Sequence, residues 1–235
     1  MSDLRVGLVC EGPTDNIVIS AAITSLLGER NYVLNQLQPE ASLAFGEMGT
    51  GWAGVYKWCL QAVDQGGGSI SNNPLFDLND VLIVHLDADV ADETYANGNI
   101  VTTANDLPCA KPCPAPSETT NNLRVVLLHW LGEMVTPPHT TLCTPSKSTE
   151  AWVLAALFPL DRIVTSGELE CQDAPANALS AKPAHSRLVR AGKKIRQRYQ
   201  DKAGDIEKAW DRVRVICTEA ERFSSEFLAT VPAHT

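Results

Sequence analysis

Two stretches decide the fold class of this chain: VGLVCEGPTD at residues 6–15 and VLIVHLDADV at residues 81–90. In each, a continuous apolar run stops abruptly near an acidic side chain, Glu11 in the first and Asp87 in the second. Apolar runs without polar alternation are typical of strands covered on both faces, as in a parallel sheet flanked by helices. The sequence therefore predicts an α/β fold whose sheet carries acidic residues at its carboxyl edge, where such folds bind ligands.

Acidic side chains in these two stretches also predict a metal site. Glu11, Asp87 and Asp89 would repel one another at one sheet edge unless a cation lay between them, which favours Mg²⁺. Asp15 follows Glu11 by about one helical turn and can face the same cleft. Asp87 and Asp89 point to opposite faces of a regular strand, so both reach one cleft only if the strand has already ended.

The length of 235 residues allows one large domain or a core with an appendage. We expect an α/β core over residues 1–160, with an irregular insertion at about 91–122, followed by a C-terminal helical extension over 161–235. No apolar run approaches the roughly 18 residues that a membrane span needs. The N-terminal residues do not resemble a signal peptide, so the expected location is cytoplasmic.

The distribution of charge is uneven. The whole chain has a net charge of −9, but the basic segment 182–202 has eight basic residues and one acid, a local charge of +7 that leaves −16 elsewhere. Such a strip could contact a phosphate backbone, or it could be a solvated helix face paired with the chain's own acids. The candidate nucleic-acid contacts within it are Arg187, Arg190, Lys194 and Arg198.

The seven cysteines do not suggest a disulfide framework in a chain of this size, and most are expected to be reduced thiols. Four residues have a spacing that could hold a structural Zn²⁺, namely Cys109, Cys113, His139 and Cys143. The spacing is looser than in a typical zinc knuckle and prolines crowd the first pair, so free thiols near a Pro-rich loop are the favoured interpretation.

The remaining chain is mainly helical by its apolar periodicity. Trp210 and Phe223 lie on a clean amphipathic stripe and are expected to anchor the core. Helices are predicted over 15–27, 52–63, 123–135, from 150 onward, 186–202 and, with Asp205 as N-cap, 205–227; strands are predicted over 32–37 and 140–144; and 161–182 is predicted to be irregular.

The segments CEGPTD, which contains Glu11, and DAD at 87–89 resemble the TOPRIM domain shared by topoisomerases, bacterial primases and the OLD family of nucleases. The resemblance covers residues 4–92 and implies a TOPRIM-like fold whose carboxylates hold one or two Mg²⁺ or Mn²⁺ ions. It implies a metal-dependent nuclease that acts on nucleic acid, more on DNA than on RNA, with a role in antiviral defence. No Walker A motif is present, so any ATPase it requires would be a separate subunit.

A later segment, KSTEAW at 147–152, resembles a part of small stand-alone TOPRIM-like proteins in which an acid at a helix start completes the site. The resemblance makes Glu150 a further metal ligand and Glu11 a ligand or a general acid/base. Lys147, Lys193 or Lys194 would stabilise the pentacovalent phosphate. The alternative is that Glu150 only favours a helix N-terminus electrostatically.

Two other functions fit parts of the sequence. The strand and the D-x-D at residues 87–89 also resemble a GT-A glycosyltransferase, which would use them to bind Mn²⁺ and a nucleotide sugar, but this leaves EGPTD without a role. A non-catalytic TOPRIM-like module that binds a partner protein is the second alternative. The intact acids at Glu11, Asp87 and Asp89 favour the nuclease.

Overall fold

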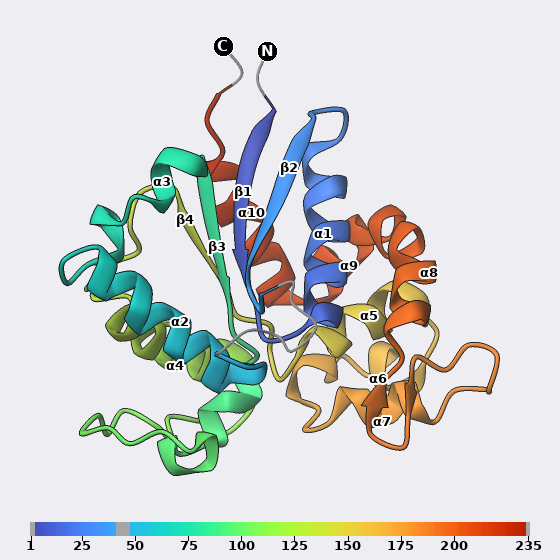
Figure 1. Ribbon diagram of the computed structural model, residues 1–235. Helices are drawn as coiled ribbons and strands as arrows, with labels where there is room; N and C mark the ends of the chain where they lie inside the picture. The colour runs from blue at the N-terminus through green and yellow to red at the C-terminus, as the bar shows by residue number, and fades with distance from the viewer. Residues whose placement is uncertain (1–2, 41–47, 234–235) are drawn as a thin grey trace.

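The computed structural model describes residues 3–40 and 48–233. Its centre is a sheet of four parallel strands in the order β2-β1-β3-β4 (Figure 1). The strands are β1 (Leu4–Val9), β2 (Tyr32–Gln38), β3 (Val81–His85) and β4 (Thr140–Cys143). The predicted α/β class with a parallel sheet flanked by helices is therefore confirmed.

The register of the two central strands places their acidic ends together. Val9 of β1 pairs with Val84 of β3, so the residues that follow each strand emerge at the same edge of the sheet. Every residue of β3 is buried, as expected for a strand covered on both faces. The apolar runs thus bring Glu11 and Asp87 to the carboxyl edge.

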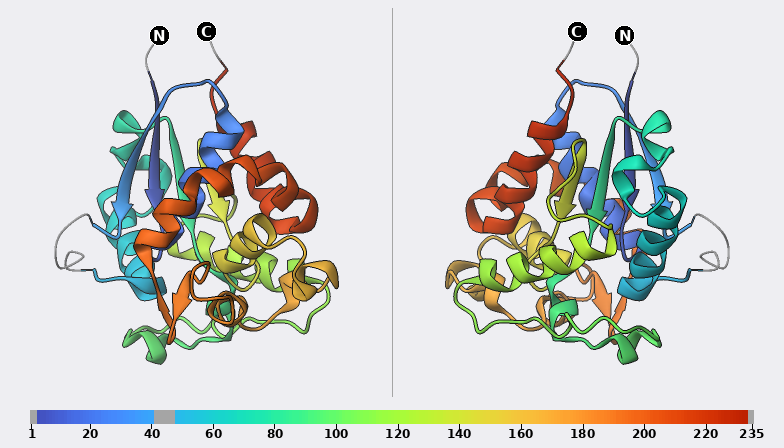
Figure 2. Two further views of the ribbon diagram at one scale, coloured as in Figure 1. Left: turned by 90° about the vertical axis from the view of Figure 1, so that its right-hand side faces the viewer. Right: turned by 90° about the vertical axis from the view of Figure 1, so that its left-hand side faces the viewer.

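Helices cover both faces of the sheet, and the two side views show one face each (Figure 2). One face packs against α1 (Pro13–Leu27), α5 (Thr149–Leu157), α8 (Arg196–Lys208), α9 (Trp210–Ile216) and α10 (Thr218–Thr230). The opposite face packs against α2 (Gly51–Gln65) and α4 (Pro116–Trp130). Among the helices of the described ranges, none is long and apolar enough to cross a bilayer.

Aromatic side chains join the last helices to the rest of the core. The ring of Trp152 on α5 lies 5.3 Å from the ring of Trp210 and 6.0 Å from that of Phe223. Trp210 and Phe223 are buried, which confirms their prediction as core anchors. Residues beyond 161 thus share one hydrophobic core with β1 and α1.

Short helical elements fill the segments predicted to be irregular. The predicted insertion at 91–122 contains the end of η2 (Ala88–Asp92), η3 (Tyr95–Gly98) and the first turns of α4, which begins at Pro116 and ends at Trp130. The predicted irregular stretch 161–182 contains further short helices. The remaining short elements are η1 (Ile70–Asn72), α3 (Leu75–Leu78), α6 (Arg162–Thr165), η4 (Leu169–Cys171) and α7 (Pro175–Ser180).

The basic segment does not form the single helix predicted over 186–202. It begins as a hairpin of β5 (Val189–Arg190) and β6 (Lys193–Lys194), and α8 follows. The two residues between the strands, Ala191 and Gly192, both have positive φ, the conformation that two-residue hairpin turns require. The prediction of Asp205 as an N-cap is also wrong, because this residue lies inside α8.

The cysteines form one disulfide that the sequence did not predict, between Cys113 and Cys171. The other five are free thiols, in agreement with the expectation that most are reduced. The four-residue zinc set is not assembled, because the sulfur of Cys113 is engaged in the disulfide and Cys143 is buried within β4.

Candidate metal site

The site is built where β1 and β3 end. Oε1 of Glu11 accepts a hydrogen bond of 2.7 Å from the backbone N–H of Asp87, which ties the two acidic segments together. Strand β3 stops at His85, and the chain turns into η2 at Ala88. Asp87 and Asp89 therefore do not lie on one regular strand, which removes the geometric obstacle to their facing one cleft.

His85 joins this cluster from the last position of β3. One ligand atom from each of Glu11, His85 and Asp87 lies within 4.8 Å of the other two. Nε2 of His85 lies 3.0 Å from Oδ1 of Asp87, while its Nδ1 has no partner within the described parts of the chain. Sequence reasoning missed His85, because a histidine at the end of an apolar strand gives no sign by itself that its ring lies beside an acid.

A second group of side chains surrounds Lys194. Its Nζ lies 2.9 Å from Oε1 of Glu150 and 3.4 Å from Oδ1 of Asp15. The hydroxyl of Tyr199 donates to Oε1 of Glu150 at 2.9 Å, and the hydroxyl of Thr149 donates to Oδ1 of Asp15 at 2.7 Å. We call this the lysine group; it consists of Asp15, Glu150, Thr149, Lys194 and Tyr199.

Thr149 connects the lysine group to the Glu11–Asp87 cluster. Its backbone N–H, at the start of α5, donates to Oδ1 of Asp87 at 3.0 Å, and its hydroxyl bonds Asp15. The first N–H groups of a helix have no partner within that helix, so the N–H of Thr149 is free to bond Asp87. One residue thus fixes the relative position of two carboxylates from different parts of the chain.

Burial and mutual repulsion raise the pKa values of two of the carboxyl groups. Burial, reinforced by the charges of Asp87, Asp89 and Asp15, raises the pKa of Glu11 well above its usual value. Burial and the charge of Asp87 raise the pKa of Asp89 to about 7. Five carboxyl groups thus face one ammonium and one imidazole, a surplus of acid that a divalent cation would compensate.

In the lysine group, burial raises the pKa of Glu150, although the charge of Lys194 opposes this rise. Burial opposes the charge of Lys194, but the attraction of Glu150 and Asp15 outweighs it and raises the pKa of the ammonium. Burial likewise opposes the ionisation of Asp15, yet Lys194, His85 and the Thr149 hydroxyl lower its pKa. Lys194 thus serves as an internal counter-ion for two of the chain's own carboxylates.

Two other predicted lysines lie away from the carboxylates. The ammonium of Lys147 pairs with Asp173 at 3.1 Å and with Asp92 at 3.7 Å, so it is engaged outside the site. Lys193 is exposed on β6, next to Lys194 in sequence. Neither therefore contacts Glu11 or Asp87 in this arrangement.

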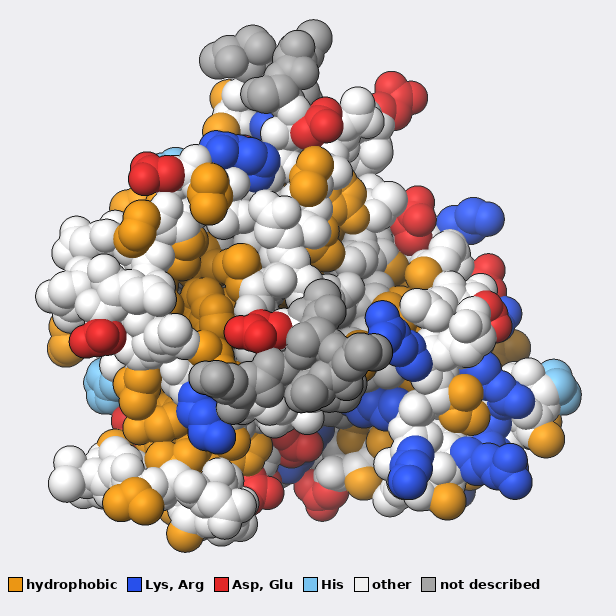
Figure 3. All heavy atoms as spheres, in the orientation of Figure 1, with side chains coloured by type: hydrophobic (Ala, Val, Ile, Leu, Met, Phe, Trp, Pro, Cys, Tyr) orange, Lys and Arg blue, Asp and Glu red, His pale blue; other side chains and the backbone are white. Residues whose placement is uncertain are grey.

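The predicted nucleic-acid contacts divide into two kinds. Arg187 and Arg198 donate to backbone carbonyls, those of Lys182 and Ala184 respectively, and so brace the loop before the hairpin. Arg190 is exposed on β5, beside the exposed Lys193. In the space-filling view, basic side chains gather at the lower right, over the region of α6 to α8, and acidic ones lie at the bottom centre (Figure 3).

Comparisons of the chain with models of protein families, with curated proteins and with solved structures gave no match.

Proposed function

We propose that this protein is a metal-dependent nuclease of the TOPRIM type that hydrolyses phosphodiester bonds, in DNA more than in RNA. The observation that carries the proposal is the hydrogen bond between Glu11 and the N–H of Asp87. It unites the EGPTD and DAD segments in one acidic cluster at the carboxyl edge of a parallel sheet, where α/β folds bind ligands.

The residues present fit a hard divalent cation. Glu11 and Asp89 have no ion-pair partner within the described ranges, and a ring nitrogen of His85 lies within 4.8 Å of a carboxylate oxygen of Glu11 and one of Asp87. Glu11, Asp87 and Asp89 would hold Mg²⁺ or Mn²⁺, with His85 beside them. When bound, the metal would polarise a phosphoryl oxygen and lower the pKa of a water molecule.

The chain's own residues would supply the remaining interactions. The Lys194 side chain is about one-third exposed (32%), so its ammonium can face a phosphate oxygen while it stays paired with Glu150. Thr149 keeps Asp87 in place through its backbone N–H. Arg190 and Lys193, exposed on the neighbouring hairpin, would bind the phosphates that flank the cleaved bond.

The contact of Glu11 with Asp87 also favours a nuclease over a GT-A glycosyltransferase. In the glycosyltransferase interpretation the D-x-D alone binds the metal, and Glu11 has no role. Here Glu11 is half-buried against the D-x-D, and desolvation and those aspartates raise its pKa. Holding acids this close together costs free energy, which a bound cation would offset.

An activity assay tests the proposal. The purified protein is incubated with supercoiled plasmid, single-stranded DNA, RNA or nucleotide sugars, with Mg²⁺ or Mn²⁺, and compared with Glu11→Gln and Asp87→Asn. We expect metal-dependent nicking that both variants lower by at least ~100-fold, a loss typical of removing one transition-state contact. Asp64→Asn, which neutralises an exposed carboxylate on α2, is the matched control and should cleave like the wild type.

Turnover of a nucleotide sugar that survives Glu11→Gln would overturn the proposal in favour of the glycosyltransferase. Binding of Mg²⁺ without cleavage of any nucleic acid would instead favour a partner-binding module.

The presence of His85 favours Mn²⁺ over Mg²⁺ as the bound metal. Imidazole is a better ligand for transition metals than for Mg²⁺. Calorimetric titration should therefore show tighter binding of Mn²⁺ than of Mg²⁺. His85→Asn should weaken Mn²⁺ binding more than Mg²⁺ binding, whereas an equal effect on both metals would place His85 outside the ligand set.

A further inference from the structure

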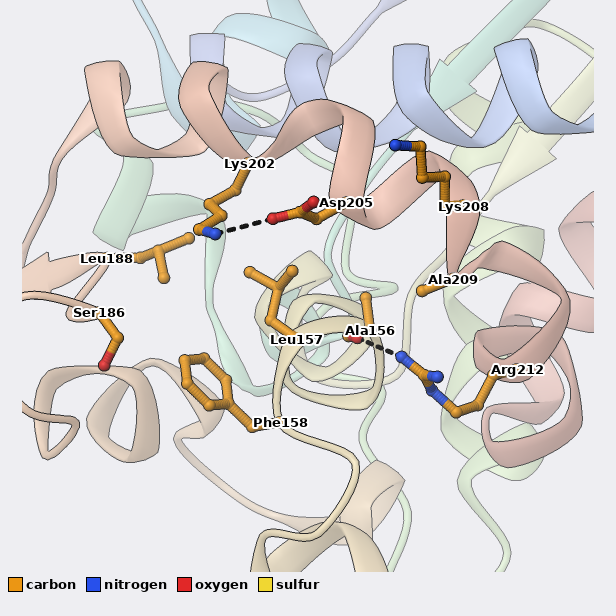
Figure 4. A pocket seen from close by; sticks show the side chains of 10 residues that line it. All are labelled: Ala156, Leu157, Phe158, Ser186, Leu188, Lys202, Asp205, Lys208, Ala209 and Arg212. Atoms are coloured by element: carbon orange, nitrogen blue, oxygen red, sulfur yellow. Dashed lines mark hydrogen bonds and ion pairs between the residues drawn. The ribbon is translucent and has the colours of Figure 1, made fainter.

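A cavity of about 420 Å³ lies outside the candidate metal site, between the end of α5, the second half of α8 and the segment at 186–188. Its volume falls within the range of small-molecule pockets, roughly 300–1,000 Å³. The close view shows α8 on one side, with Leu157 and Phe158 opposite it (Figure 4). No residue of the metal cluster or of the lysine group lines the cavity.

One side of the cavity is cationic. Lys202, Lys208 and Arg212 line it with a single acid, Asp205, which leaves two positive charges in a chain whose overall charge is −9. Lys202 pairs with Asp205 at 2.7 Å, and Arg212 donates to the carbonyl of Ala155 at 3.3 Å. Lys208 has no ion-pair partner in the described part of the chain, so its ammonium is available to a ligand.

The other side is apolar. Leu157, Phe158 and Leu188 line it, and Leu188 is only 2% exposed although it borders the cavity. An inorganic anion alone would leave this wall in contact with water, and a purely apolar ligand would leave Lys208 and Arg212 without a counter-charge. The lining therefore suits a ligand that is anionic at one end and largely apolar at the other.

We propose that this cavity binds a nucleoside monophosphate. The four charged side chains that line the cavity have a net charge of +2. This charge matches a phosphate monoester, which carries about −1.5 to −2 at neutral pH, better than it matches a single carboxylate. The phosphate would contact Lys208 and Arg212, and the base would lie against Leu157 and Phe158. Asp205, which lies between Lys202 and Lys208 on α8, and the hydroxyl of Ser186 would hydrogen-bond the sugar hydroxyls (Figure 4). The proposal does not rest on the nuclease activity.

Calorimetric titration of the full chain with adenosine 5′-monophosphate, in EDTA so that no metal bridges the phosphate elsewhere, tests the site. We expect saturable binding with a dissociation constant below ~1 mM, and binding of adenosine and of inorganic phosphate at least about tenfold weaker. Lys208→Gln should weaken nucleotide binding about threefold to fivefold, the effect of one exposed charge pair. Lys57→Gln, an equal change of charge on α2, should bind like the wild type.

Three outcomes would overturn the proposal: no saturable binding, equal binding of adenosine or of phosphate alone, or a Lys208→Gln variant that binds as well as the wild type. Asp87→Asn separates this site from the metal cluster and should leave the binding unchanged. Loss of binding in that variant would place the nucleotide at the carboxylates and refute the assignment to the cavity.

Discussion

The ammonium of Lys194 lies 2.9 Å from Oε1 of Glu150, in a position where the sequence predicts a metal ion. Glu150 and Asp15 thus already have a cation from the chain itself. Glu11 and Asp89 have no such cation as a partner within the described residues. The candidate metal site is therefore expected on the side of Glu11 and Asp87, with Lys194 as a fixed positive charge beside it.

Replacing this lysine tests its role as a counter-ion. Lys194→Met leaves two buried carboxylates without their partner. The free energy of unfolding should fall by about 2 kcal/mol, less than for a fully buried pair because the lysine side chain is partly exposed. Urea denaturation at neutral pH measures the change. Lys193→Met, which removes an exposed charge next to it, should change stability by no more than about 0.5 kcal/mol, and equal effects of the two variants would contradict the prediction.

Thr149 offers a matched pair of variants for the link between the two carboxylate groups. Thr149→Val keeps the shape and the backbone N–H but removes the hydroxyl that bonds Asp15. We expect a loss of about 1–3 kcal/mol, because the Asp15 oxygen then has one donor fewer in a buried place. Thr149→Ser keeps the hydroxyl and should recover most of this loss in the same denaturation experiment. If Thr149→Val is as stable as the wild type, the hydrogen bond to Asp15 does not stabilise the fold and the prediction fails.

The dependence of stability on pH should include a contribution from Asp80. Its hydrogen bonds and ion pair with Arg5 lower the pKa of the carboxyl group in the folded protein. The ionised form therefore stabilises the fold above the unfolded pKa of about 3.9, and this stabilisation is lost as the pH falls through the folded value. The urea midpoint of the wild type should fall more steeply from pH 5 to pH 2.5 than that of Asp80→Asn; parallel curves would refute the assignment.

Phe223 tests whether the C-terminal helices belong to the central core. Phe223→Ala removes a ring that stacks on Trp152 of α5, so the free energy of unfolding should fall by about 3–5 kcal/mol. Thermal unfolding should remain a single transition when followed both by tryptophan fluorescence and by circular dichroism. Val215→Ala, an exposed position, is the control. Two separate transitions would mean that residues beyond 161 unfold as an independent unit.

The central sheet was predictable because its strands carry a local signal. The apolar runs before Glu11 and Asp87 identify β1 and β3, and the parallel register that follows brings the two acids together. The helices predicted over 15–27, over 52–63 and from 150 onward were found within two residues of their predicted bounds. The helix predicted over 123–135 instead spans 116–130, and the one predicted over 205–227 is divided into the end of α8, α9 and α10. The hairpin in the basic segment was not predicted, because the many charges of this segment are also typical of a solvated helix. In the structure, Ala191 and Gly192 form a hairpin turn instead.

The candidate site was only partly predictable. Individual acids stand out because each ends an apolar run, but an ion pair between Lys194 and Asp15 joins residues from opposite ends of the chain and leaves no local pattern. His85 was hidden for another reason. A histidine within an apolar strand is more often a core residue, and only the structure shows its ring beside Asp87.

The hairpin of β5 and β6 makes the lysine group a late product of protein synthesis. Glu11 leaves the ribosome first and Glu150 much later, but the ammonium of Lys194 and the hydroxyl of Tyr199 follow both. A shortened product that stops between Glu150 and Lys194 would keep the sheet residues and all five acids, yet Glu150 would lack both of these partners. Such a fragment would retain the residues that join Glu11, Asp87 and Thr149 but would leave Glu150 without a counter-ion.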